Sequence, residues 1–246
     1  MTPKLSVVVP VFDEADNVEP LITQVLLAVG NQPGGVELIL VDDCSRDATW
    51  QRIQEQSAKD SRVVGVRHSQ NRGQSAALWT GFKQASGTTI ATLDGDLQND
   101  PADLPMMIGK LADADLICGV RTKRADSFVK KVSSRLARWA RRIALQSSFL
   151  DTGCNLRVFR REVLDTVPAF DGFHRFMPVL AQSGGAVVCE VPVQHHPRRA
   201  GVSKYGVWNR LGRGIRDLIM IGLFIRRQLR VMPERTTESL PGPTTR

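Results

Sequence analysis

The chain has 246 residues, a length that suits one large domain or one domain with an appendage. Its hydrophobic content of 42% and charged content of 24% are those of an ordinary folded protein. The four cysteines are far apart and form no CxxC pair, which argues against a zinc site or a disulfide framework and favours a reducing cytoplasm. The first apolar run is interrupted by Pro10 and ends at Asp13-Glu14, so it indicates a buried strand rather than a signal peptide.

The net charge of +8 is distributed unevenly along the chain. Residues 121–142 and residues 195–230 each contain nine Lys or Arg and a single acid. These two segments together carry +16, and the rest of the chain carries −8. An acidic body with two basic segments indicates an anionic partner, which could be nucleic acid, an acidic membrane surface or a phosphorylated substrate.

The first 120 residues alternate short apolar runs with helical patterns. The apolar runs predict strands at Leu5–Val11, Val36–Val41, Val63–Arg67, Thr89–Leu93 and Asp115–Val120. The segments between them predict helices at about Asn17–Val29, Thr49–Ala58, Gln74–Ala85 and Asp103–Leu111. Strands that are apolar throughout and separated by helices predict an α/β fold, in which a Rossmann-like, mostly parallel sheet is covered on both faces.

The pattern changes after Val120. We expect a basic helix at about 128–145, a short irregular or β segment at 151–160 and a final strand at 186–193. The segment 208–231 alternates apolar and basic residues at helical spacing, and its apolar part, 218–225, is too short to span a bilayer. It can instead lie in a membrane interface, or pack in the core or a dimer interface. We therefore divide the chain into a catalytic domain (1–207), an amphipathic helical extension (208–231) and a disordered tail (232–246).

Polar clusters follow the predicted strands. They are Asp13-Glu14, Asp42-Asp43, Asn71-Arg72-Gly73 and Asp94-Gly95-Asp96. In an open α/β sheet, ligands bind in the crevice beyond the carboxyl ends of the strands, so four clusters at one edge indicate a binding site there.

The segment Asp94-Gly95-Asp96-Leu97-Gln98 has the composition of a cation site. Two carboxylates two residues apart point the same way while the backbone stays extended. With a third oxygen from Gln98 they suit Mg²⁺ or Mn²⁺ carried with a diphosphate. The alternative is an acidic turn that caps the helix after Pro101, and this segment alone does not decide between the two.

The motifs as a set resemble a known family. The series V-V-P-V-F-D-E, V-D-D-C-S-R-D, N-R-G and D-G-D-L-Q-N-D-P is similar to the inverting family 2 glycosyltransferases, which have the GT-A fold. The stretches D-T-G-C-N-L-R-V-F-R-R and R-R-A-G-V-S-K-Y-G narrow the resemblance to the branch of dolichol-phosphate mannosyltransferase and the bacterial polyprenyl-phosphate glycosyltransferases. Two departures are Phe12-Asp13, where the family more often has Tyr-Asn, and 153–157, where it commonly has G-F-R/K.

The resemblance implies roles for particular residues. The nucleotide-sugar would be bound by Pro10, Phe12, Glu14, Asp42, Arg72, Asp94, Asp96 and Lys204. The metal would be held by Asp94, Asp96 and Gln98. The acceptor phosphate would meet Arg121, Arg135 and Ser203, and Arg199, Ser203 and Lys204 would close over phosphate as a loop. The catalytic residues would be Asp96, Arg121 and Arg199.

The function implied is inverting, metal-dependent transfer of a sugar from GDP-mannose or a UDP-hexose to a dolichyl or undecaprenyl phosphate. A phosphate monoester is already anionic, so no general base is needed to activate it. The basic segments favour an anionic membrane surface as a further partner, at the cytoplasmic face of the membrane and peripheral to it. A homo-oligomer or a small membrane partner is also compatible with the sequence.

The sequence leaves three alternatives. A family 2 transferase of cell-envelope polysaccharide synthesis with a non-lipid acceptor is disfavoured by Arg121, Arg135 and the R-x-G-x-S-K loop. A nucleic-acid-binding protein is disfavoured by the single tyrosine and by the lack of a reader motif, so we expect no nucleic-acid partner. A degenerate transferase that only binds is disfavoured by the intact Asp94, Asp96, Gln98 and Arg199.

Overall fold

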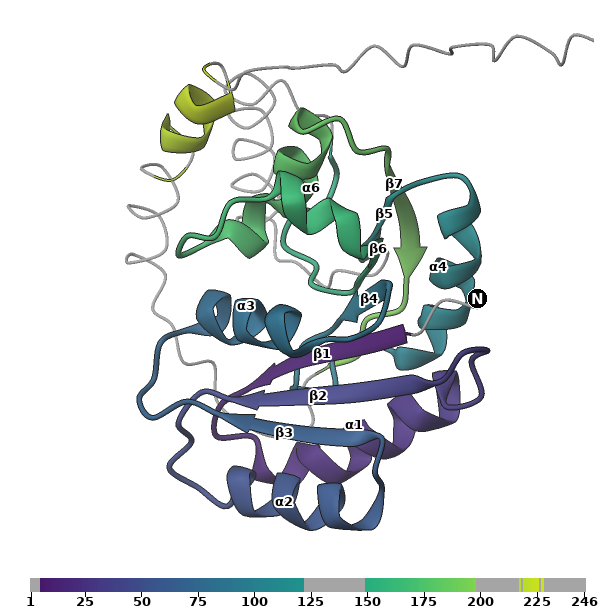
Figure 1. Ribbon diagram of the computed structural model, residues 1–246, viewed down its shortest axis with the longest axis vertical. Coiled ribbons are helices and arrows are strands. Elements are labelled where there is room, and N and C mark those ends of the chain that lie inside the picture. The colour runs from purple at the N-terminus through teal and green to yellow at the C-terminus, as the bar shows by residue number, and fades with distance from the viewer. Residues whose placement is uncertain (1–4, 122–148, 198–216, 218, 226, 228–246) are drawn as a thin grey trace, which may run out of the picture.

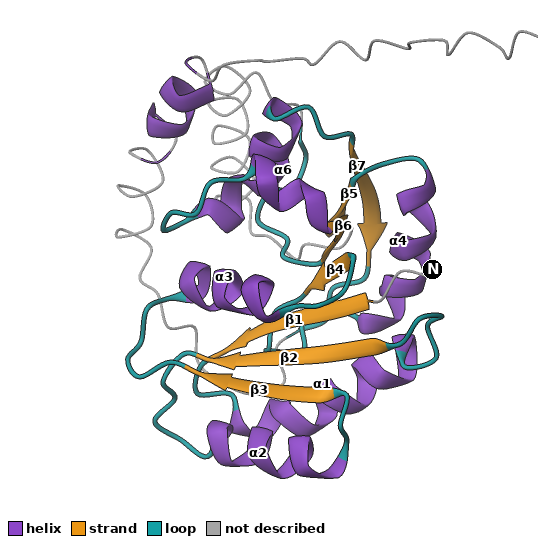
Figure 2. Ribbon diagram, in the orientation of Figure 1, coloured by secondary structure: helices purple, strands orange, loops and turns teal. Residues whose placement is uncertain are grey.

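A computed structural model describes residues 5–121, 149–197, 217, 219–225 and 227. Within these residues, seven strands form one sheet in the order β3-β2-β1-β4-β6-β5-β7 (Figures 1 and 2). The strands are β1 Leu5–Val11, β2 Val36–Asp42, β3 Val63–Arg67, β4 Thr89–Thr92, β5 Leu116–Arg121, β6 Arg157–Arg160 and β7 Val188–Val193. The basic helix and the tail expected at 128–145 and 232–246 lie outside the described residues.

The sheet is mostly parallel, as the apolar runs predict. Strands β1 to β4 pair in parallel, and β5 pairs in parallel with β7. Strand β6 is the exception, because it lies between β4 and β5 and is antiparallel to both. The segment 151–160, expected to be irregular or β, therefore supplies an internal strand of the sheet.

The helices are α1 Ala15–Val29, α2 Thr49–Lys59, α3 Gln74–Gln84, α4 Leu104–Gly109 and α6 Phe173–Ser183. Short 3₁₀ turns lie at Pro101–Asp103, Lys110–Ala112 and Arg161–Thr166. The helix expected at about 103–111 is observed as α4, with its last part in 3₁₀ rather than α form at Lys110–Ala112. Pro101 and Pro105 lack the N–H that continues a regular helix, so they are confined to the first positions of short turns.

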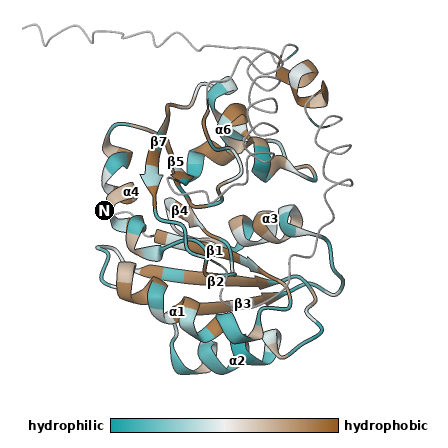
Figure 3. Ribbon diagram, turned by 180° about the vertical axis from the view of Figure 1, so that it is seen from behind, coloured by the Kyte–Doolittle hydropathy of each residue, from teal (hydrophilic) through white to brown (hydrophobic). Residues whose placement is uncertain are grey.

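Each face of the sheet has its own hydrophobic core, because successive strand residues point to opposite faces. Val7 and Val9 of β1 pack in one core with Leu21 of α1, and α4 completes that face. Val8 packs in the other core with Phe82 of α3 and the apolar side of α6. The strands are mostly hydrophobic and the outer surface of α2 is hydrophilic (Figure 3).

Residues 219–225 are helical and rest on the second core. Ile221 is buried there, and Ile225 packs partly against it. Four large apolar side chains remain exposed: Ile219 (57%), Met220 (62%), Leu223 (50%) and Phe224 (41%). None of the helices that the structure describes is long and apolar enough to cross a bilayer.

The chain direction decides which residues gather at one edge of the sheet. The carboxyl ends of the parallel strands meet there, so the segments after β1, β2, β3 and β4 are neighbours. The antiparallel β6 brings its beginning to this edge instead. In the register of β4 with β6, Thr92 lies opposite Arg157, so the residues just before β6 lie beside those just after β4.

Candidate active site

The Asp94-Gly95-Asp96 turn follows β4 and packs against the end of β1. A Cβ atom on Gly95 would lie 2.7 Å from Val11 Cγ1 and 3.2 Å from the Pro10 carbonyl oxygen. Only glycine allows this approach, so the two strand ends are held together at this point. Leu97 has φ 59°, a left-handed conformation that is uncommon for residues other than glycine and that turns the chain sharply after Asp96.

The Asp94 carboxylate accepts two hydrogen bonds at the same oxygen. Gln74 Nε2 and Asn155 Nδ2 each lie 2.9 Å from Asp94 Oδ1. Burial raises the pKa of Asp94, and the nearby charge of Asp96 raises it further. The hydrogen bond from Asn155 and the positive charges of Arg157 and Arg121 oppose that rise. A cation beside Asp94 would relieve both the burial cost and the repulsion.

Asp96 and Gln98 lie next to Asp94 in the turn. Asp96 is 8% exposed, and its Oδ1 accepts a hydrogen bond from the Gln98 backbone N–H at 3.2 Å. Gln98 Nε2 donates to the His196 carbonyl at 3.4 Å, and among the described residues no hydrogen bond goes to its side-chain oxygen, which can serve as a ligand.

These oxygens fit a hard divalent cation. Among the described residues, no group of three or more His, Cys, Asp or Glu side chains could hold a metal ion. Mg²⁺ is commonly bound through one or two carboxylates together with substrate phosphates rather than by a full protein cage. The pair Asp94 and Asp96 matches that kind of site, in which the substrate completes the coordination.

The acids at the end of β2 are bonded to the protein itself. Asp42 is fully buried, and its Oδ1 accepts hydrogen bonds from the N–H and hydroxyl of Ser45, while Arg67 Nε lies 3.0 Å from its Oδ2. Asp43 accepts from the backbone N–H groups of Arg72 (2.9 Å) and Gly73 (2.7 Å). Its Oδ1 also lies 2.8 Å from His68 Nδ1. Asp43 therefore fixes the loop before α3, and the nucleoside role of Asp42 stays a prediction.

The other predicted donor residues also lie near this edge. Pro10 is half-buried at the end of β1, and Phe12 follows the strand. Glu14 precedes α1 and accepts a hydrogen bond from Asn17 Nδ2 at 2.6 Å. Arg72 has an exposed side chain. Their contacts with a nucleotide stay predictions.

Arg121 ends β5 and is held by an acid that the sequence did not single out. Its Nε and Nη2 donate to the two carboxylate oxygens of Asp151 at 2.7 and 2.8 Å. Burial lowers the pKa of Arg121, but these bonds outweigh it and the net shift is upward. The guanidinium is a fixed positive charge close enough to Asp94 to affect its pKa. Four further predicted residues, Arg135, Arg199, Ser203 and Lys204, lie outside the described residues.

Arg157 at the start of β6 is a second buried cation near Asp94, and it was not predicted. It is 2% exposed, and it donates from Nη1 to the His174 carbonyl at 2.5 Å and from Nη2 to the Thr152 carbonyl at 3.0 Å. Its charge also helps keep His174 neutral. The one sequence signal that could have found it is its place in the D-T-G-C-N-L-R stretch, which carries the family resemblance.

The adjacent histidines after β7 make separate contacts. His196 Nε2 lies 2.9 Å from Asp100 Oδ2. His195 pairs with Asn99 across an isolated β-bridge. They fasten the segment after β7 to the turn that carries Gln98.

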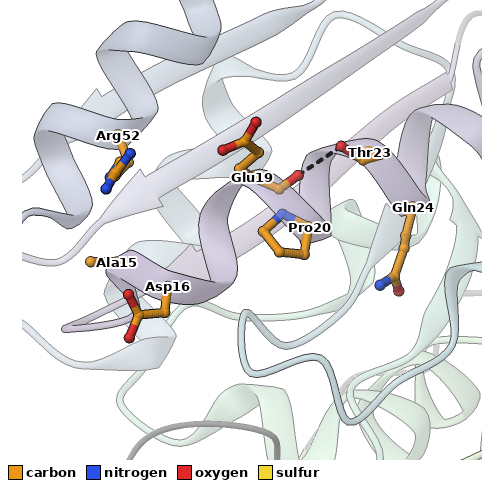
Figure 4. A pocket seen from close by; sticks show the side chains of 7 residues that line it. All are labelled: Ala15, Asp16, Glu19, Pro20, Thr23, Gln24 and Arg52. Carbon is orange, nitrogen blue, oxygen red and sulfur yellow. Dashed lines mark hydrogen bonds between the residues drawn. The ribbon is translucent and has the colours of Figure 1, made fainter.

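A groove lies beside α1 and α2 (Figure 4). It is lined by Ala15, Asp16, Glu19, Pro20, Thr23, Gln24 and Arg52. The hydroxyl of Thr23 donates to the Glu19 carbonyl at 2.9 Å, within α1. None of the strand-end carboxylates described above lines this groove, so it is separate from the candidate site.

The sequence of the chain matches the model of Glycosyl transferase family 2 over residues 6–168. It is 38% identical over 235 residues to dodecaprenyl-phosphate galacturonate synthase of Rhizobium johnstonii. The aligned region covers 92% of this chain and 69% of that protein. It is 36% identical over 203 residues to undecaprenyl-phosphate 4-deoxy-4-formamido-L-arabinose transferase of Pseudomonas fluorescens. This aligned region covers 82% of this chain and 60% of that protein. The chain belongs to glycosyl transferase family 2.

Solved structures show the same fold. Glucosyl-3-phosphoglycerate synthase of Mycobacterium tuberculosis, in complex with Mn²⁺ and UDP-glucose, aligns with a TM-score of 0.66 and 21% identity over 91% of this chain and 79% of that one. A mannosyltransferase of Pyrobaculum calidifontis, in complex with GDP-Man and Mn²⁺, aligns with a TM-score of 0.65 and 20% identity. This alignment covers 91% of this chain and 65% of the mannosyltransferase chain. These neighbours are GT-A glycosyltransferases, and the predicted GT-A fold is confirmed.

Proposed function

We propose that this chain transfers a sugar from a nucleotide-sugar to the phosphate of a polyprenyl phosphate, with Mg²⁺ or Mn²⁺ at Asp94 and Asp96. Because the chain spans 60–69% of the length of the two relatives compared above, their acceptors come to it as a proposal. The observation that carries the proposal is the pair of neighbouring carboxylates after β4, of which Asp96 is buried and Asp94 half-buried. They lie at the sheet edge where nucleotide ligands bind in this class of fold, and the charge of Asp96 helps raise the pKa of Asp94, a cost that a cation would relieve.

The site has the charges that such a reaction needs. The leaving group is a diphosphate and the acceptor is a phosphate, so the two substrates repel each other. A divalent cation, when bound, neutralises the leaving diphosphate. Arg121 and Arg157 add fixed positive charges on the β5 and β6 side of Asp94. Because these charges are already in place before the reaction, they stabilise developing negative charge without reorganising.

No general base is required at this site. An acceptor phosphate is already anionic, and its oxygen can attack the anomeric carbon directly, with inversion as the nucleotide leaves. The protein then has to orient the two substrates and exclude water. The arginines predicted at 135 and 199, with Ser203 and Lys204, are proposed to complete the acceptor and donor phosphate contacts.

Extraction of a labelled product tests the acceptor. The chain is incubated with radiolabelled nucleotide-sugars and Mn²⁺, with and without undecaprenyl phosphate. We expect label in the organic phase only when the lipid phosphate is present, and none with EDTA. If label stays in the aqueous phase with every donor, a lipid acceptor is wrong. Transfer to 3-phosphoglycerate or another soluble phosphate would then identify a different acceptor.

Attachment to an anionic membrane surface is the second part of the proposal. Ile219, Met220, Leu223 and Phe224 form the exposed side of the 219–225 helix, while Ile221 anchors its other side in the core. An apolar side beside basic residues is typical of interfacial helices. Burial of about 25 cal/mol per Å² of apolar surface favours insertion, and nearby basic residues add attraction to anionic lipid.

Flotation with vesicles of phosphatidylglycerol and phosphatidylcholine tests this attachment. We expect the chain to float at low salt, and Leu223→Asp with Phe224→Asp to abolish flotation. The matched control is Leu27→Asp, because Leu27 is an 86% exposed leucine on α1, away from this helix. A wild-type chain that stays in solution at low salt would count against attachment.

A further inference from the structure

Two neutral side chains from distant parts of the sequence hold the same oxygen of Asp94. Gln74 is the first residue of α3, and Asn155 lies two residues before β6. Both amide nitrogens are 2.9 Å from Asp94 Oδ1. Among the described residues, no hydrogen bond goes to Asp94 Oδ2, so the second oxygen can face a ligand.

The backbone on both sides of Gln74 is fixed. The N–H of Gly73 donates to Asp43 Oδ2 at 2.7 Å, and Gly73 has φ 84°, which lets the chain turn into α3. On the other side, the hydroxyl of Ser75 accepts from the N–H of Gly172 at 2.7 Å. The start of α3 is therefore tied to the end of β2 and to the turn before α6. Gln74 has little freedom to leave Asp94.

The sheet register places Asn155. Because Thr92 lies opposite Arg157 in the antiparallel pair of β4 and β6, Asn155 falls opposite Asp94. The Asn155 carbonyl accepts from the Thr92 hydroxyl at 2.6 Å, and the next carbonyl, of Leu156, accepts from the Gly119 N–H at 2.9 Å. A parallel strand in this position would bring its other end to the site.

The chemistry of these two donors suits a cation site. An amide donates a hydrogen bond without carrying a charge, so it fixes the carboxylate while leaving its negative charge for a cation. A lysine or arginine at either position would neutralise Asp94 and compete with a metal. The buried Asp42 and Asp43 show the opposite arrangement, because Arg67 and His68 contact them directly.

We propose that Gln74 and Asn155 are positioning residues that hold the Asp94 carboxylate with one oxygen directed at the cation. This inference rests on the proposed cation site at Asp94 and Asp96. Partners that orient a metal-binding carboxylate typically change metal affinity by about 10- to 100-fold when they are removed. Each amide should therefore affect Mn²⁺ affinity far more than it affects folding.

Titration of the whole chain with Mn²⁺, followed by electron paramagnetic resonance, tests the inference. It is done with the nucleoside diphosphate that most raises the melting temperature of the wild type. We expect Gln74→Met and Asn155→Leu, which keep the side-chain size but remove the donor, each to weaken Mn²⁺ binding about tenfold. The matched control is Gln84→Met, at the exposed end of the same helix, and it should bind Mn²⁺ like the wild type.

Gln74→Lys separates positioning from a purely structural role. The lysine can still donate to Asp94, so stability should be kept, but its charge should weaken Mn²⁺ binding at least as much as Gln74→Met does. Mn²⁺ affinities within twofold of the wild type in Gln74→Met, Asn155→Leu and Gln74→Lys would overturn the inference while leaving the cation site intact. Loss of folding in all three would assign the amides a structural role and would also overturn it. A wild type that binds no Mn²⁺ with any nucleoside diphosphate would overturn the proposed site as well.

Discussion

Two acidic pairs stand at the ends of strands that flank β1 on either side, and the protein uses them differently. Asp42 and Asp43 end β2 and are bonded by Ser45, Arg67, His68 and the backbone before α3. Asp94 lies in the turn after β4 and is bonded by two neutral amides, with the charge of Asp96 close by. In the first arrangement the protein hydrogen-bonds Asp43 and pairs Asp42 with Arg67, although Asp42 Oδ2 accepts no hydrogen bond among the described residues. The second keeps a negative charge that a cation can satisfy.

The largest expected effect is on catalysis at the second pair. Asp96→Ala should lower sugar transfer at least about 1000-fold, equivalent to about 4 kcal/mol in the barrier, because the cation loses a ligand. Transfer is measured as label in the organic phase, and folding by circular dichroism. Asp113→Ala, at an exposed acid outside the site, is the control. Near-normal turnover by Asp96→Ala would sink the metal assignment.

The first pair should respond in stability instead. Asp43→Ala is expected to lower the free energy of unfolding by about 2–4 kcal/mol, because it leaves the N–H groups of Arg72 and Gly73 and the ring of His68 without their acceptor. Urea denaturation measures this loss. A loss below about 1 kcal/mol would mean that Asp43 does not hold the loop before α3.

The two regions also differ in their half-buried histidines. His68 contacts Asp43, whereas His174 bonds Ser75 and has Arg157 and Arg175 as neighbours. Burial and the positive charges of Arg157 and Arg175 together lower the pKa of His174 to about 3, with burial the largest cause. Between pH 6.5 and about pH 3, the unfolded chain binds more protons at His174 than the folded chain does. The stability that His174 contributes is therefore complete above pH 6.5 and falls by up to about 1.4 kcal/mol per pH unit below it.

His174→Asn isolates this contribution, because it can keep a hydrogen bond to Ser75 and does not titrate. Urea denaturation at pH 6.5 and at pH 5.5 is compared for the variant and the wild type. We expect the variant to lose less stability over this step. Equal losses in the two proteins would show that His174 takes up a proton as easily in the folded state.

The smallest expected effect is the stability of Asp94→Asn. The asparagine keeps an oxygen that can accept from Gln74 and Asn155, and it removes a half-buried charge next to Asp96. Its free energy of unfolding should be equal to that of the wild type or higher by up to about 1 kcal/mol. Its Mn²⁺ binding should be lost. A clear loss of stability by thermal melting would show that the charge of Asp94, like that of Asp43, holds the fold together.

The parallel part of the sheet could be predicted from the sequence because its strands are uninterrupted apolar runs between turn residues. Leu5–Val11 and Val63–Arg67 are the observed strands to the residue. The sequence leaves the four-residue β6 open as an irregular or β segment, since R-V-F-R begins and ends with a charge and gives no apolar run. Its place between β4 and β5 depends on pairing between distant segments, which local patterns do not contain.

The site was predictable where chemistry is visible in residue type. The acids at 94 and 96 stand out as carboxylates after an apolar run, and the set of motifs identified the family. Gln74 and Asn155 look like ordinary turn residues, and only the register of β4 with β6 and the turn into α3 brings them to Asp94. Arg157 was missed for the same reason, because its burial depends on the carbonyls of 152 and 174.

Anomalous diffraction from crystals of the chain grown with Mn²⁺ and a nucleoside diphosphate tests the central claim most directly. The account predicts one Mn²⁺ within about 2 Å of carboxylate oxygens of Asp94 and Asp96, with diphosphate oxygens completing its coordination. It also predicts no Mn²⁺ at Asp42 and Asp43. A metal at the end of β2, or a diphosphate bound without metal at Asp94, would contradict it.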